Sequence, residues 1–253
     1  MKMTKRLATL AACAVMATSS MVGMGAFATD YNVNQLSDMS DNANISVNSY
    51  SPALLNTING WADSLYASSG FGNSLSYSSG WYNSISDVEL LARLIYAEAT
   101  TNSTYCNTEQ IAVTWVLVNR KNSSQFPDSL RDIATQTSPI QFSSITGSSS
   151  ATSNARNPVK NSAWKHAIWM SCAILSTSDT SDYMWLFGKP TGIDNQLFFY
   201  ASSIATFGTS SGILTINGVK AKNVAYAGYG NVTTTSTATS ISSSYRNIYY
   251  NYY

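Results

Sequence analysis

The chain has 253 residues, of which 44% are hydrophobic and 11% are charged. This suits one folded domain with loose ends and is scarcely enough for two. The chain has 14 Lys and Arg residues and 13 Asp and Glu residues. Three of the basic residues lie in the predicted signal peptide described below, so the mature chain would keep 11 (14 minus 3) and have a net charge of about −2. Because phosphates call for a basic patch, we expect no nucleic-acid partner.

Residues 1–28 have the pattern of a secretory signal peptide. Lys2, Lys5 and Arg6 precede an apolar stretch, and Ala26-Phe27-Ala28 predicts cleavage after Ala28. An alternative is lipidation of Cys13 in Leu10-Ala11-Ala12-Cys13, although the apolar run before it is shorter than the ~7–15 residues usual for a signal. No later run approaches the roughly 20 residues of a membrane helix. We therefore expect a secreted protein without a membrane span.

Residues 29–83 are rich in Ser, Asn, Gly and Tyr, which indicates a spacer with one helix at 52–66. Order begins at Ser86, which forms a capping box with Glu89. An apolar helical stripe then follows, made of Val88, Leu91, Leu94 and Ile95. Glu98 continues this stripe, so its carboxyl group is carried toward the core.

Three further helices are predicted along the chain. The first starts near Asn107 or Thr108 and runs to residue 121, apolar on nearly every face, as in a central buried helix. Phe126-Pro127-Asp128 caps a short helix through Ile133, and Asn157-Pro158 opens a longer one that ends near Leu175. A polar loop at 137–156 separates these two helices.

The last third of the chain has the period of strands. A strand is predicted at 197–200, a hairpin at 213–222 around Asn217-Gly218, and an extended segment at 224–229. Residues 231–253 have too little aliphatic content for another core, which indicates a Ser/Thr/Tyr-rich tail. The predicted fold class is α+β, mainly helical with a small late antiparallel sheet.

Glu98 is the first candidate for chemistry. A carboxyl group on an apolar face loses hydration, which raises its pKa and lets it hold a proton near neutral pH. Such an acid can protonate the departing oxygen of a glycosidic bond. From spacing alone, the alternative is a helix-end Glu98 that faces solvent or pairs with Arg93.

Three blocks of the sequence resemble the SleB-like cell-wall hydrolase family, of the spore-cortex-lytic type. They are DVELLARLIYAEA at 87–99, EQIAVTWVLVNRKNSSQFPDSLRDIATQ at 109–136 and PIQF at 139–142. Weaker likeness continues through AWKHAIWMSCAIL at 163–175, LFFYAS at 197–202 and VAY at 224–226, so the resemblance covers about residues 84–230.

The resemblance implies a lysozyme-like catalytic domain at 84–230 that cleaves the glycan strands of peptidoglycan. It implies a lytic transglycosylase with Glu98 as catalytic acid, acting without metal or cofactor on the cell wall or spore envelope. Three places depart from the family pattern: Thr100-Thr101-Asn102 replaces Arg-Gly-Glu, Glu109 replaces a Gly, and Ala201-Ser202 replaces Asn-Pro. The last difference puts a substrate contact of that Asn in doubt.

Gln141 and Phe142 match the Gln-Phe block of the family. An amide beside an aromatic ring suits a sugar, and the alternative is that Phe142 packs while Gln141 caps a turn. Tyr200 alternates with Phe198 along its strand, so its ring either lines the substrate site or packs in the core.

Asn119, Arg120 and Gln110 also match the family. The position of Asn119 and Arg120 at the end of a buried helix favours structural roles, in which they hydrogen-bond a loop and complement the helix terminus. Gln110 is interpreted as part of a helix cap, because it is the third residue after Asn107.

A hydrolase with two carboxyl groups needs a second Asp or Glu within ~5–10 Å of the first, and none is in a convincing position. A hydrolytic muramidase or glucosaminidase nevertheless stays an alternative, as does a non-catalytic spore or wall protein.

A cysteine peptidase would need His166, which lies about 240° around its helix from Cys172, so these two side chains do not face each other. Cys106 and Cys172 are either disulfide-bonded or two buried thiols. One histidine and two cysteines without close spacing make no zinc site. We expect no cofactor and a monomer.

Overall fold

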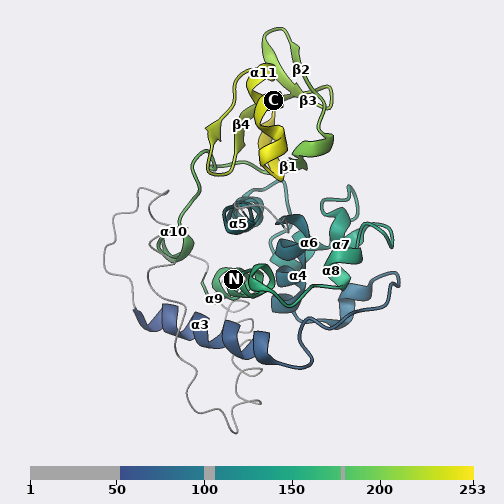
Figure 1. Cartoon of the computed structure of the whole chain (residues 1–253), viewed down its shortest axis with the longest axis vertical. Coiled ribbons are helices and arrows are strands. Elements are labelled where there is room, and N and C mark those ends of the chain that lie inside the picture. Colours follow the sequence, from purple (N-terminus) through teal and green to yellow (C-terminus); the bar gives the residue numbers. More distant parts are fainter. Residues whose placement is uncertain (1–51, 100–105, 178–179) are drawn as a thin grey trace.

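The computed structural model describes residues 52–99, 106–177 and 180–253. Figure 1 shows them as a body of helices with a small sheet on one side. The helical elements of the body are α3 (Pro52–Ala67), η1 (Trp81–Ser84), α4 (Asp87–Ala99), α5 (Cys106–Asn122), α6 (Leu130–Ala134), α7 (Ser143–Thr146), α8 (Ser153–Arg156), α9 (Ser162–Ser176) and α10 (Thr180–Phe187). The predicted signal peptide and its cleavage site lie outside the described residues.

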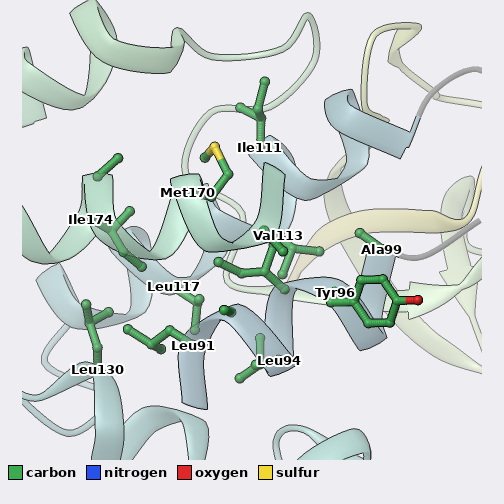
Figure 2. Close-up of a cluster of buried hydrophobic side chains, with 14 of the residues drawn as sticks. Leu91, Leu94, Tyr96, Ala99, Ile111, Val113, Leu117, Leu130, Met170 and Ile174 are labelled. Carbon is green, nitrogen blue, oxygen red and sulfur yellow. The ribbon is translucent and has the colours of Figure 1, made fainter. Parts of the chain in front are cut away.

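The core of the helical body lies where α4 packs against α5 and α9. The predicted apolar stripe of α4 is confirmed, because all four of its members are buried: Val88, Leu91, Leu94 and Ile95. Figure 2 shows Leu91 and Leu94 among side chains of α5 and α9, including Leu117 and Met170. Helix α5 is buried on nearly every side, as its sequence predicts.

The start of α4 contains half of the predicted capping box. The Ser86 hydroxyl accepts a hydrogen bond from the backbone N–H of Glu89 at 3.3 Å. The Glu89 carboxylate does not accept the hydrogen bond from the Ser86 backbone N–H that would complete the box, and instead forms a 2.7 Å ion pair with Arg93. Since Arg93 is occupied in this way, the pairing of Arg93 with Glu98 that the spacing left open does not occur.

The two later helices begin after the residues that the sequence indicated. Ser129, not Asp128, caps α6 by accepting from the Asp132 N–H at 3.0 Å. Asn161 caps α9 by accepting from the Trp164 N–H at 2.9 Å. The region predicted as one polar loop contains α7 and α8.

Residues 52–83 are part of the folded body. The helix predicted at 52–66 is confirmed as α3, which packs against α9. Ile58, Phe71 and Trp81 are buried, and the Trp81 indole N–H donates to the Ile145 carbonyl at 3.0 Å. The prediction of a spacer was therefore wrong for this part, because apolar side chains spread among Ser and Asn still reach the core.

The sheet follows the helices in the chain. Its six strands are β1 (Phe198–Ala201), β2 (Phe207–Ser210), β3 (Ile213–Ile216), β4 (Val219–Tyr226), β5 (Gly230–Asn231) and β6 (Asn247–Tyr252). Their order is β1-β6-β4-β3-β2, with β5 paired to β4, and every pairing is antiparallel. The short helices η2 (Ser202–Ile204), α11 (Thr235–Ile241) and η3 (Ser242–Ser244) complete this part.

The predicted hairpin is confirmed between β3 and β4. Its two turn residues both have positive φ, 53° at Asn217 and 79° at Gly218, as a type I′ turn requires. Strand β4 continues into the extended segment predicted at 224–229 but ends at Tyr226, and residues 227–229 form a turn. The pairing of β4 is irregular between Lys222 and Ala225.

The segment predicted as a tail is folded, and that prediction was wrong. Residues 247–252 form β6, which lies between β1 and β4 inside the sheet. Tyr249 on one face belongs to the core of the helical body, while Ile248 and Tyr250 on the other face pack with Ala238 of α11. Tyrosine rings supply here the apolar area that aliphatic side chains usually provide.

The predicted α+β class, mainly helical with a small late antiparallel sheet, is confirmed. Within the described ranges, none of the helices is long and apolar enough to cross a membrane.

Deletion of residues 247–253 tests whether β6 is integral to the fold. Burial of Ile248, Tyr249 and Tyr250 at about 1.5–3 kcal/mol each predicts a loss of at least about 5 kcal/mol in the free energy of unfolding. Urea denaturation measures this loss, with deletion of the exposed Tyr253 alone as control. Equal stability of the two truncated proteins would restore the interpretation as a tail.

Candidate functional site

Glu98 lies in the last turn of α4, where the helix meets the sheet. Its side chain is half-buried, between the buried residues Ala97 and Ala99. The Ser144 hydroxyl of α7 donates a 2.5 Å hydrogen bond to the Oε1 atom of Glu98. The Asn247 amide of β6 donates to the backbone carbonyl of Glu98 at 3.1 Å. Residues distant in sequence therefore meet at this glutamate.

The pKa of the Glu98 carboxyl group is raised, because its burial disfavours the charged form. The Ser144 hydrogen bond and the positive charges of Arg246 and Arg120 act in the opposite direction and stabilise the carboxylate. Since dehydration prevails over these three interactions, the group is suited to hold a proton and to take it back after releasing it. Such a group can serve as both general acid and general base.

Arg120 is 3% exposed and lies at the end of α5. Its Nε–H donates to the Leu197 carbonyl at 2.7 Å, and its guanidinium carbon lies 4.7 Å from the centre of the Phe142 ring and 5.7 Å from that of Phe198. Burial lowers its pKa to about 10, so it stays charged near neutral pH. The predicted hydrogen bond to a loop is confirmed, and the sequence did not indicate the additional effect on Glu98.

Gln141 and Phe142 directly precede α7, the short helix whose Ser144 contacts Glu98. Phe142 is 1% exposed and packs under Arg120 and against Phe199, at 6.0 Å between ring centres. The Gln141 side chain is half-buried, and its amide contacts the Pro139 carbonyl at 3.5 Å within its own turn. Phe142 thus supports the site from beneath, while Gln141 lies at the surface.

Tyr200 lies on the edge strand β1, on the same face as Phe198. Its side chain is 37% exposed, so part of the ring is open to a ligand. Phe198 lies beside Arg120, whose charge acts on Glu98.

Glu109 is a functional candidate that the sequence analysis missed. It is 0% exposed in the first turn of α5 and accepts hydrogen bonds from the backbone N–H groups of Arg246 (3.1 Å) and Asn247 (3.4 Å). Its other oxygen accepts from the Tyr249 hydroxyl at 2.6 Å. Glu109, which replaces a Gly of the family pattern, thus anchors β6, whose first residue contacts Glu98.

Ser144 and Arg246 were also missed. Nothing in the serine-rich segment around Ser144 distinguishes it by sequence, and Arg246 lay in the supposed tail. The one available signal was Glu109 itself, an acidic residue next to the apolar middle of α5.

His166, Gln110 and Asn119 have structural roles. His166 is buried, its Nδ1 lies 2.6 Å from the Gln110 side-chain oxygen, and burial lowers its pKa to about 4. Gln110 also donates to the Ala163 carbonyl, so it bridges α5 and α9 and is not a cap. Asn119 donates to the Asp194 and Gln196 carbonyls, which confirms its predicted contact with a loop.

Two sequence questions fall partly outside the described residues. Cys172 is buried on α9, but the side chain of Cys106 is not described, so both alternatives for these cysteines stand. The residues 100–102 that depart from the family pattern are not described either. Within the described ranges, no cluster of three or more His, Cys, Asp or Glu side chains is able to hold a metal ion.

Part of the chain is similar to a known protein family. Residues 106–210 match the sequence model of the family described as Cell Wall Hydrolase. This match supports a relationship of the chain to cell-wall hydrolases and a function in peptidoglycan cleavage. The match spans less than half of the chain; it includes Arg120, Ser144 and Tyr200 and begins after Glu98. No curated protein and no solved structure matches. The likeness to lysozyme and to the spore-cortex type therefore stays a prediction.

The Glu109 carboxyl group makes stability depend on pH. Burial raises its pKa from 4.5 to about 7 against the hydrogen bonds from Tyr249 and the backbone, so the folded state binds its proton more tightly than the unfolded state. This contribution is complete below pH 4.5 and is lost as the pH rises to about 7, by roughly 3 kcal/mol in total. Glu109→Gln should remove that slope. Urea denaturation between pH 4.5 and 8 measures it, and parallel pH profiles for the variant and the wild type would refute the assignment.

Ser144→Ala tests the hydrogen bond to Glu98. The hydroxyl stabilises the carboxylate, so its removal should raise the pKa of Glu98 further. If Glu98 must be protonated for activity, the decline of kcat/KM at high pH should move to higher pH in the variant. Ser143→Ala, at an exposed position on the same helix, is the matched control. A decline at unchanged pH would show that this bond does not govern the acid.

Proposed function

We propose that this protein is an exported lytic transglycosylase that cleaves the glycan strands of peptidoglycan, with Glu98 as general acid and base. The observation that carries the proposal is the environment of the Glu98 carboxyl group, which is dehydrated enough to raise its pKa and is held by Ser144. The Cell Wall Hydrolase match supports the substrate class.

The proposed reaction transfers one proton twice. Glu98 first donates its proton to the oxygen that joins muramic acid to the next sugar, and the bond between this oxygen and C1 breaks. The C6 hydroxyl of the same muramic acid then bonds to C1, and its proton returns to the Glu98 carboxylate. No water is consumed, and the product carries a 1,6-anhydro end.

The arrangement of the other acids favours this reaction over hydrolysis by two carboxyl groups. The charged groups that act on Glu98 within the described residues are Arg120 and Arg246, and none is a carboxylate. Glu109 is fully buried with both oxygens engaged, so it is not available to activate water. Asp87 and Glu89 form ion pairs at the opposite end of α4.

We assign the sugar contacts to Gln141 and Tyr200. The side-chain amide of Gln141 lies at the surface of the turn that carries Ser144, and the exposed Tyr200 ring offers a face for the C–H side of a sugar. Phe142 has an indirect part, since its ring supports Arg120.

Glu98→Gln tests the function directly. Loss of the proton should lower the release of soluble muropeptides from purified peptidoglycan by a factor on the order of 10²–10⁴. Asp128→Asn removes an exposed carboxylate from the same body and should retain full activity. The melting temperature of each variant checks that it is folded.

Mass analysis of the same digests identifies the reaction. Products of a lytic transglycosylase are lighter by one water than those of a hydrolase. Full activity of Glu98→Gln would reject Glu98 as the catalytic acid, whereas reducing ends released by the wild type would reject only the transglycosylase mechanism.

A further inference from the structure

Two arginines flank Glu98 from separate parts of the fold. Arg246 immediately precedes Asn247, whose amide contacts the Glu98 carbonyl, and its own backbone N–H is fixed by Glu109. Arg120 lies over Phe142, two residues before Ser144, whose hydroxyl contacts the Glu98 carboxyl group. The hydrogen bond to Leu197 and the packing on Phe142 hold the Arg120 guanidinium, and the Glu109 contact fixes the backbone of Arg246. The positive charges of both arginines act on the Glu98 carboxyl group.

Both guanidinium groups have unused hydrogen-bond donors. The Nη1 atom of Arg120 and the Nε atom of Arg246 are buried and have no acceptor within the described part of the chain. Neither arginine belongs to the ion pairs found among these residues. A buried donor without an acceptor is costly, and a buried cation without a counter-charge is more so.

The imbalance is greatest in the state needed for catalysis. When Glu98 carries the proton that it must donate, it no longer offers negative charge to Arg120 and Arg246. Glu109 cannot replace it, because its oxygens are occupied by the N–H groups of residues 246 and 247 and by the Tyr249 hydroxyl. The protonated site thus holds positive charge that a ligand can neutralise.

We propose that Arg120 and Arg246 form a subsite for a carboxylate of the polysaccharide, next to Glu98. This inference rests on the proposed function, and it adds that the substrate must be anionic at this position. Peptidoglycan offers carboxylates from two sources, the stem peptides and the lactyl group of muramic acid after stem removal. Guanidinium groups bind such carboxylates through paired, charge-assisted hydrogen bonds.

Binding of a carboxylate would also prepare Glu98 for its reaction. The anion would engage the two positive charges that otherwise stabilise the Glu98 carboxylate, and its own negative charge would disfavour ionisation of that group. The substrate would thereby help to keep the proton on the acid until the glycosidic bond breaks. A neutral strand would lack this effect even if it occupied the same position.

The test compares glycan strands that differ only in charge. One set keeps its carboxylates, and in the other they are converted to methylamides. We expect the wild type to cleave the anionic strands with a kcat/KM at least about tenfold higher, as loss of a charged hydrogen bond predicts. Arg246→Gln should bring this ratio close to one, and Arg246→Lys, which keeps the charge, should restore part of it.

Lys222→Gln is the matched control, since it removes an exposed positive charge from the neighbouring strand β4. It should leave the ratio unchanged, and thermal melting checks the fold of every variant. A ratio near one in the wild type, or an unchanged ratio in Arg246→Gln, would overturn the subsite while the proposed function stands. Failure of the wild type to cleave either set would overturn the proposed function and the subsite with it.

Enzymatic removal of the stem peptides distinguishes the two carboxylate sources. A preference that persists after removal assigns the lactyl carboxylate as the ligand. A preference that disappears with the stems assigns the stem carboxylates, and either result supports an anionic subsite.

Discussion

The hydrogen bonds between Glu109 and the start of β6 join the two parts of this protein. One buried carboxyl group at the beginning of α5 receives two backbone N–H groups and one tyrosine hydroxyl from the last strand. This contact fixes where Arg246 and Asn247 lie, and both residues act on Glu98. The site therefore depends on a contact between helix and sheet that itself touches no substrate.

Around Glu98, opposing effects are balanced. Burial favours the neutral acid, whereas a hydroxyl and two guanidinium groups favour the carboxylate. A carboxyl group with burial alone would bind its proton strongly and release it reluctantly. The polar neighbours moderate this tendency, so both charge states of Glu98 are supported, as the proposed reaction, in which it first gives and then recovers a proton, requires.

The parts of the structure that local sequence determines were predictable. The stripe of α4, the apolar α5 and the Asn217-Gly218 hairpin each follow from residues close together in the chain, and Glu98 was placed on the core side by the same periodicity. Contacts between distant segments were not predictable. Ser144 lies in a run of similar residues, and the role of Arg246 depends on the pairing of β6 with β1 and β4. Composition misled as well, because burial of tyrosine rings compensates for scarce aliphatic residues in residues 231–253.

The position of β6 has a consequence for when the surroundings of Glu98 are complete. This strand comes last among the described elements yet lies between two earlier ones, so the sheet cannot close until the ribosome has made residues 247–252. The helices form from local contacts and can precede it. A polypeptide still in synthesis would carry Glu98 without the neighbours that tune it, so under the proposed function any cutting of the wall polymer would wait until this strand is in place.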